Sequence, residues 1–129
     1  MSELLRLAKT RFSGTLKNRF AQSIKIDLVG GRFSFLDDVA RILDLWENDG
    51  IMFHCNVNAQ RFFVFKEKEP DSYYPRFNER SGYRFASKDL KNLIVKTLEL
   101  DQSKRYHFFI VNETPDQKNG FFELIYVDK

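Results

Sequence analysis

The chain has 129 residues, of which 43% are hydrophobic and 30% are charged, and its formal net charge is +3. These values are typical of one globular domain of ordinary size and exclude an intrinsically disordered chain. The mild positive charge permits binding to nucleic acid or another polyanion without requiring it. Cys55 is the only cysteine, which excludes an intrachain disulfide and a cysteine-based zinc site and suits a reducing compartment.

Residues 1–22 are predicted to form a basic helical segment ahead of a single α+β domain over residues 23–129. The segment lacks the apolar run and cleavage site of a signal peptide. No stretch of the chain approaches the ~20 apolar residues of a membrane span, so we expect a cytoplasmic protein. The apolar stripe of the predicted helix consists of Leu4, Leu5, Ala8 and Phe12. Its polar side carries Arg6, Lys9, Arg11, Lys17 and Arg19.

The first part of the domain is predicted to be a strand followed by a helix. Residues 23–29 alternate apolar and polar side chains, which is typical of a strand, and two glycines end this pattern. Ser34 occupies an N-cap position with Asp37 three residues later, as in a capping box. Apolar residues then repeat at helical spacing as far as Trp46, so we expect a helix from Ser34 to Trp46.

The rest of the domain is predicted to contain four strands and one further helix. Residues 51–57 and 62–66 have strand composition and are separated by a short polar turn, which predicts a hairpin. Ser87 is expected to cap a helix, and residues 106–111 and 121–127 are expected to be strands. The predicted buried face of this helix carries Leu90, Leu93, Ile94 and Leu98.

The resulting order of elements matches the split βαβ plan of ferredoxin-like folds, with one extra strand at the C-terminal end. We therefore expect a mainly antiparallel sheet of about five strands with two helices packed on one face. The other face of such a sheet needs a cover, and the N-terminal helix is a candidate for it. A sheet of different strand order flanked by the same helices is the alternative.

No catalytic motif stands out. His54 and His107 both fall in predicted strands, and two histidines cleave RNA only where both reach one phosphate. The acidic residues after Ser34 suit a solvated helix face better than a metal site. The turn Gly30-Gly31 lacks the spacing of a phosphate-binding loop. We therefore expect neither a metal nor a cofactor, and the sequence favours a protein that is not an enzyme.

Residues 67–86 are the strongest candidate for a binding segment, because a long loop rich in both tyrosine and arginine is unusual. Aromatic faces with interleaved guanidinium groups suit single-stranded nucleic acid, and the same residue types anchor protein interfaces. An ordered loop whose aromatic side chains cover an edge of the core is the third interpretation. The candidate binding residues here are Tyr73, Tyr74, Arg76, Phe77, Arg80, Tyr83 and Arg84, and a basic track would extend from Lys9, Arg11, Lys17 and Arg19.

The function favoured by the sequence is a small binding module for single-stranded nucleic acid, with the aromatic residues stacking on bases and the arginines contacting phosphates. The alternative is a protein–protein interaction module, such as an adaptor, inhibitor or immunity-type protein. A small ribonuclease that uses His54 or His107 is the third hypothesis. No membrane partner is expected, and the sequence does not determine the oligomeric state.

Overall fold

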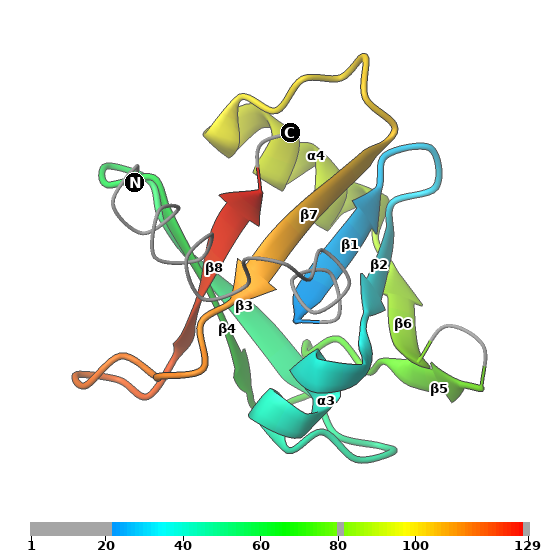
Figure 1. The fold of residues 1–129 in the computed structure, drawn as a ribbon, viewed down its shortest axis with the longest axis vertical. Coiled ribbons are helices and arrows are strands. Elements are labelled where there is room, and N and C mark those ends of the chain that lie inside the picture. Colours follow the sequence, from blue (N-terminus) through cyan, green and yellow to red (C-terminus); the bar gives the residue numbers. More distant parts are fainter. Residues whose placement is uncertain (1–21, 80–81, 128–129) are drawn as a thin grey trace, which may run out of the picture.

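The computed structural model describes residues 22–79 and 82–127. The N-terminal helical segment predicted above therefore lies, apart from Gln22, outside the described residues. The described part is an eight-stranded antiparallel sheet that curves into a half-barrel, with two short helices (Figure 1). The strands are β1 (Ser23–Asp27), β2 (Arg32–Phe35), β3 (Ile51–Asn56), β4 (Arg61–Lys66), β5 (Arg76–Asn78), β6 (Gly82–Ala86), β7 (Tyr106–Val111) and β8 (Phe122–Val127), and the helices are α3 (Asp37–Leu43) and α4 (Lys88–Leu98).

The strand order across the sheet is β3-β4-β8-β7-β1-β2-β6-β5. β1 with β2, β3 with β4, β5 with β6 and β7 with β8 pair as neighbours in sequence, and the pairs β4–β8, β1–β7 and β2–β6 join these four units. The two edges of the sheet approach each other. Ile51 of β3 and Tyr73, three residues before β5, exchange two backbone hydrogen bonds of 2.8 and 2.9 Å. The Phe53 ring of β3 also lies 5.9 Å from the Phe33 ring of β2, on the opposite half of the sheet. The sheet therefore wraps around its own core instead of lying flat beneath two helices.

The concave face of the sheet holds one aromatic-rich core. Phe33, Phe35 and Phe109 are buried in it, and each such side chain stabilises the fold by about 1.5–3 kcal/mol. Figure 1 shows the two helices near opposite ends of the sheet. Both pack on this concave side, because the core cluster includes Val39 and Leu43 of α3 and Leu90 and Ile94 of α4.

The prediction of a ferredoxin-like sheet of five strands with two packed helices is wrong. Residues 32–35 form β2 and not the start of a helix, because Phe33 and Phe35 alternate into the core at strand spacing. Gly31, whose φ of +66° favours glycine, completes the turn that pairs β1 directly with β2. The segment 67–86, predicted as a loop, contains β5 and β6. No helix therefore separates the first two strands, and the βαβ order is lost.

Helix α3 is shorter than the predicted helix at both ends. Leu36 occupies its N-cap position without a side-chain hydrogen bond, so Ser34 is not the cap. Asp44 adopts a left-handed φ of 51° and ends the helix, which leaves Trp46 outside it and 68% exposed. The Trp46 backbone N–H donates to Asp49 Oδ2 at 2.8 Å, and this bond lowers the pKa of Asp49 below 3.8. The loop after α3 is thus held by its own hydrogen bonds.

The remaining elements confirm their predictions with small differences. The β3–β4 hairpin, β7 and β8 are present, and Ser87 Oγ accepts the backbone N–H of Leu90 at 3.1 Å as the N-cap of α4. Leu90 and Ile94 of this helix are buried as expected, whereas Leu93 is exposed. Sequence periodicity therefore located α4 correctly but assigned Leu93 to the buried face, where it does not lie.

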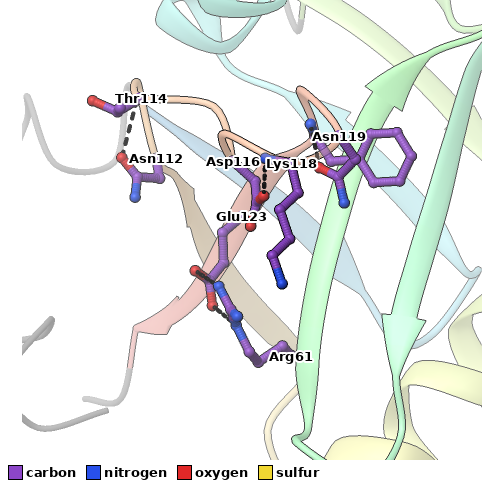
Figure 2. Close-up of polar contacts among 8 residues, drawn as sticks. Arg61, Asn112, Thr114, Asp116, Lys118, Asn119 and Glu123 are labelled. Atoms are coloured by element: carbon purple, nitrogen blue, oxygen red, sulfur yellow. Dashed lines mark hydrogen bonds and ion pairs between the residues drawn. The ribbon is translucent and has the colours of Figure 1, made fainter.

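The loop between β7 and β8 is ordered by side chains that accept backbone hydrogen bonds from residues two positions later. Figure 2 shows these contacts at Asn112, Asp116 and Asn119, with donor–acceptor distances of 3.1, 2.8 and 2.9 Å. It also shows Arg61 of β4 bound to the Glu123 carboxylate of β8 through two hydrogen bonds. These contacts hold the β4–β8 side of the sheet together on its convex face.

Candidate nucleic-acid interface

The convex face of the half-barrel has two parts of opposite character. Because partners in an antiparallel register share a face, its composition follows from the strand pairing. We call seven outward side chains of β5, β6, β2, β1 and the start of β7 the basic half. Its members are Arg76, Arg84, Ser34, Lys25, Arg32, Asp27 and Tyr106. We call the outward side chains of Phe63, Ile110, Ile125 and Val127, on β4, β7 and β8, the apolar half.

A row of cationic side chains crosses the basic half. Arg76 of β5 is opposite Arg84 of β6, Arg84 is opposite Ser34, and Ser34 is opposite Lys25 of β1. With adjacent strands about 4.8 Å apart, the row extends over roughly 14 Å. Among the residues that the structure describes, no carboxylate lies within ion-pair distance of Arg76 or Arg84. Like charges directly opposite one another destabilise a sheet, and no carboxylate in the described residues offsets this pair.

An exposed aromatic ring lies beside this row. Tyr106 is 42% exposed, and the next row of the register places it opposite Asp27. The Lys25 ammonium and the Arg105 guanidinium lie over the Tyr106 ring, 4.3 and 5.1 Å from its centre. These two cations hold the ring in place and leave part of its surface open. A ring in such a setting can stack on a nucleobase while its neighbours contact phosphates.

Asp27 is the acidic residue of the basic half, and it is already neutralised within the protein. Arg105 Nε and Nη2 donate to the two oxygens of the Asp27 carboxylate at 3.0 and 3.1 Å. Mainly through the hydrogen bond from Arg105, the pKa of Asp27 is lowered below 3.8. The carboxylate therefore stays ionised and paired at neutral pH, and it offsets Arg105 more than it offsets the arginine row.

The structure divides the binding residues predicted in segment 67–86 between the two faces of the sheet. Arg76 and Arg84 lie together on the convex face. Tyr73 is on the concave side, where its ring stacks on Phe85 at 4.8 Å, and Tyr83 contacts Phe77 edge-to-face at 5.3 Å. The predicted stacking partners and phosphate contacts in this segment are thus not brought onto one surface. Five predicted residues lie outside the described part of the chain: Arg80, Lys9, Arg11, Lys17 and Arg19.

Sequence reasoning missed Lys25, Arg32 and Tyr106 as candidate binding residues. A signal for them was present, since the Arg-Phe neighbours Arg32-Phe33 and Arg84-Phe85 place phenylalanine inside and arginine outside. Without β2, however, the outward residues of β1 and β6 could not be placed on one surface. The strand order was the missing information.

A second exposed surface lies at the end of the sheet, where the loop after α3 meets the chain that enters β5. We define this aromatic surface by Trp46, Tyr74 and Phe77, which are 68%, 40% and 54% exposed. A shallow cavity of about 700 Å³ opens beside it. Both acidic and basic side chains line the cavity, including Glu47, Lys68 and Arg76. Mixed charge around exposed aromatic rings is typical of a protein interface.

The two histidines do not meet. His54 is exposed on the convex face beside Phe63, whereas His107 is 1% exposed on the concave face. His107 Nε2 donates to the carbonyl oxygen of Asp101 at 2.9 Å, and Nδ1 lies 2.7 Å from the Tyr126 hydroxyl. His107 is therefore a hydrogen-bonded core residue. The pairing of both histidines on one phosphate, which RNA cleavage by acid–base catalysis requires, has no geometric support.

Within residues 22–79 and 82–127, no three His, Cys, Asp or Glu side chains gather into a group suited to a metal ion. No helix in this part of the chain has the length and apolar character needed to cross a membrane. The chain matches no protein-family model, and neither a curated protein nor a solved structure is significantly similar to it. Any functional inference therefore depends on the surfaces described above.

Proposed function

We propose that this protein is a non-enzymatic module that binds single-stranded nucleic acid on the basic half of its convex face. The observation that carries the proposal is the cationic row of Arg76, Arg84 and Lys25 beside the exposed Tyr106 ring. Phosphate groups would follow the row across the strands, and a base would stack on Tyr106. The single thiol of Cys55 suits a reducing compartment, and we propose that the module acts in the cytoplasm.

Such a surface favours a single strand over a duplex. A stacking platform needs bases whose faces are open, and a duplex keeps its base faces covered. The basic half offers cations and one ring, which suits recognition that is tolerant of sequence. Binding should therefore depend strongly on salt, because phosphate contacts release counterions.

The test is fluorescence anisotropy with labelled single-stranded RNA, single-stranded DNA and duplex DNA at several salt concentrations. The variant is the triple substitution Lys25→Ala, Arg76→Ala and Arg84→Ala. We expect its affinity for a single strand to fall at least about tenfold at low salt. The slope of log affinity against log salt should fall by roughly 2, since each phosphate contact on a single strand contributes about 0.7.

The matched control removes the same charge from α4, through Lys88→Ala, Lys91→Ala and Lys96→Ala. These lysines lie on a helix packed against the concave side, so the control should keep most of the affinity and most of the slope. Equal losses in both variants would show a general effect of net charge. That result, or unchanged affinity in the first variant, would contradict the proposed site.

A protein–protein interaction module is the second candidate function, and the aromatic surface favours it. Trp46, Tyr74 and Phe77 are residue types that anchor protein interfaces. The exposed Tyr74 and Phe77 rings line one shallow cavity, and exposed Trp46 directly precedes Glu47, which lines it as well. The test is co-purification from the native cell with the wild-type chain and with Trp46→Ala/Phe77→Ala. A partner lost by this variant, with nucleic-acid binding retained, would assign the protein interface to the aromatic surface.

A further inference from the structure

The apolar half of the convex face is buried although it faces away from the core. Phe63, Ile110, Ile125 and Val127 are exposed by only 5%, 3%, 5% and 6%. Ser23, opposite Ile110 in the register, is exposed by 0%. In the same sheet the basic half keeps Arg32, Arg76 and Tyr106 exposed. Because these outward apolar side chains are buried, another part of a protein chain must cover the apolar half.

The described helices do not provide that cover. Both pack on the concave side, and the core cluster that contains them does not include Phe63, Ile110, Ile125 or Val127. At one border of the apolar half the Arg61 guanidinium lies 5.0 Å from the centre of the Phe63 ring. Glu123 binds this guanidinium, as Figure 2 shows. This ion pair closes one side of the surface. The centre, around Ile110 and Ile125, needs another segment.

We propose that residues 1–21 of this same chain dock on the apolar half of the convex face. The point where this segment joins the sheet is fixed next to it. The Gln22 side chain donates to the carbonyl oxygen of Val111 at 2.9 Å, and the Gln22 carbonyl accepts the Val111 backbone N–H at 2.9 Å. The preceding chain therefore starts beside the end of β7, the strand of this surface that lies next to β1.

The segment has the length and the pattern that the surface requires. From β1 across β7 and β8 to β4 is three strand spacings, roughly 14 Å, and a helix of ~10 residues covers about 15 Å. The stripe of Leu4, Leu5, Ala8 and Phe12 supplies an apolar face at helical spacing. Docking of this stripe would bury four apolar side chains against four others. The docking does not depend on what the basic half binds.

Docking also has a consequence for charge. The same segment carries the four basic residues Lys9, Arg11, Lys17 and Arg19. A segment that starts at β1 and lies over β7 and β8 leads away from the basic half, so the residues next to Gln22 lie nearest its border. Lys17 and Arg19 would then be the cations of the segment closest to Lys25, and they would extend the row formed by Lys25, Arg84 and Arg76 at that end.

The direct test is methyl NOE spectroscopy on the full-length protein with labelled leucine and isoleucine methyl groups. We expect NOEs from Leu4 and Leu5 to Ile110 and Ile125. A mixed sample of labelled and unlabelled chains, recorded with an isotope filter, distinguishes contacts within one chain from contacts between two. NOEs that arise only between chains would make a second copy the occupant and overturn the proposal. The absence of any NOE between these leucines and isoleucines would overturn it as well.

A pair of full-length variants gives an independent test. Leu5→Asp/Phe12→Asp places two charges in the apolar stripe, whereas the control Thr10→Asp places one on the opposite side of the predicted helix. We expect amide hydrogen exchange of β7 and β8 to accelerate about tenfold or more in the first variant and to stay unchanged in the control. Unchanged exchange in the double variant would contradict docking, and equal acceleration in the control would show a general charge effect instead.

Discussion

The two halves of the convex face belong to one sheet, yet their outward side chains differ in polarity and in burial. In β1, Ile24 and Ile26 point inward and Lys25 and Asp27 outward, which is the alternation of a strand with one solvated face. In β7 and β8 the outward positions include the buried apolar residues Ile110, Ile125 and Val127. Strands that are apolar on both sides are covered on both sides. The outward residues of a strand therefore indicate whether its second face is exposed to solvent or covered by other residues.

The arginines of the two halves differ in the same way. Arg61, at the border of the apolar half, is bound by Glu123 through hydrogen bonds of 2.9 and 3.1 Å, and this contact raises the pKa of Arg61 above its ordinary value. In the described residues Arg76 and Arg84 have no such carboxylate. Arg61 therefore uses its guanidinium group within the protein, whereas the guanidinium groups of Arg76 and Arg84 are those that we propose to contact phosphate.

The strongest way to test the comparison is to place the same charge in each half. Ile125→Asp buries a carboxylate among apolar side chains and should lower the free energy of unfolding by about 3–5 kcal/mol. Ser34→Asp places the carboxylate between Arg84 and Lys25 and should change it by no more than about 0.5 kcal/mol. Urea unfolding followed by circular dichroism measures both. Similar losses in the two variants would show that the halves do not differ in burial.

Removal of the Tyr106 ring should affect binding more than folding. Tyr106→Leu removes the stacking surface between Lys25 and Arg105, and one stacked base contributes about 1–3 kcal/mol, so affinity for a single strand should fall by roughly 5- to 150-fold. The control is Tyr74→Leu, a comparably exposed tyrosine on the aromatic surface. Anisotropy titrations of both variants decide the outcome. If Tyr74→Leu loses as much affinity as Tyr106→Leu, base stacking is not specific to the basic half.

Removal of the acidic residue from the basic half should raise the affinity for a single strand, whereas Tyr106→Leu should lower it. Asp27→Asn keeps the shape of the side chain but releases Arg105 from its ion pair and adds one unit of positive charge. We expect affinity for a single strand to rise about threefold at low salt, and the gain to disappear at high salt because of screening. Weaker binding in Asp27→Asn at low salt would indicate that the orientation of Arg105 matters more than its charge.

The smallest expected effect is the contribution of Asp27 to the pH dependence of folding stability. The pKa of Asp27 is lower in the folded protein than its ordinary value of 3.8. Its contribution to stability is therefore fully present above about pH 5 and is lost as the pH falls through the lowered pKa. Thermal unfolding of wild type and Asp27→Asn between pH 7 and pH 2.5 should show a small difference that is constant above about pH 5 and then shrinks. A difference that grows as the pH falls would contradict this assignment.

Part of this structure was predictable because it depends on local chemistry. The alternation in β1, the hairpin of β3 and β4, the strands β7 and β8, and the Ser87 cap of α4 are all properties of short stretches of sequence. Other features were not predictable. Ser34 and Phe35 were predicted to start a helix, because the few residues of β2 cannot separate a strand period from a helical one when the apolar pattern continues into α3.

The candidate site depended on information that no local pattern contains. The sequence by itself determined that arginine points outward where phenylalanine points inward, because neighbouring residues in a strand face opposite sides. Only the tertiary structure decided that Arg76, Arg84 and Lys25 form one row, since they lie on three different strands and meet through the register of β5, β6, β2 and β1. It also decided that Tyr73 belongs to the core and Tyr106 to the surface. Pairing between strands distant in sequence is a property of the whole sheet, and one register places every outward side chain at once.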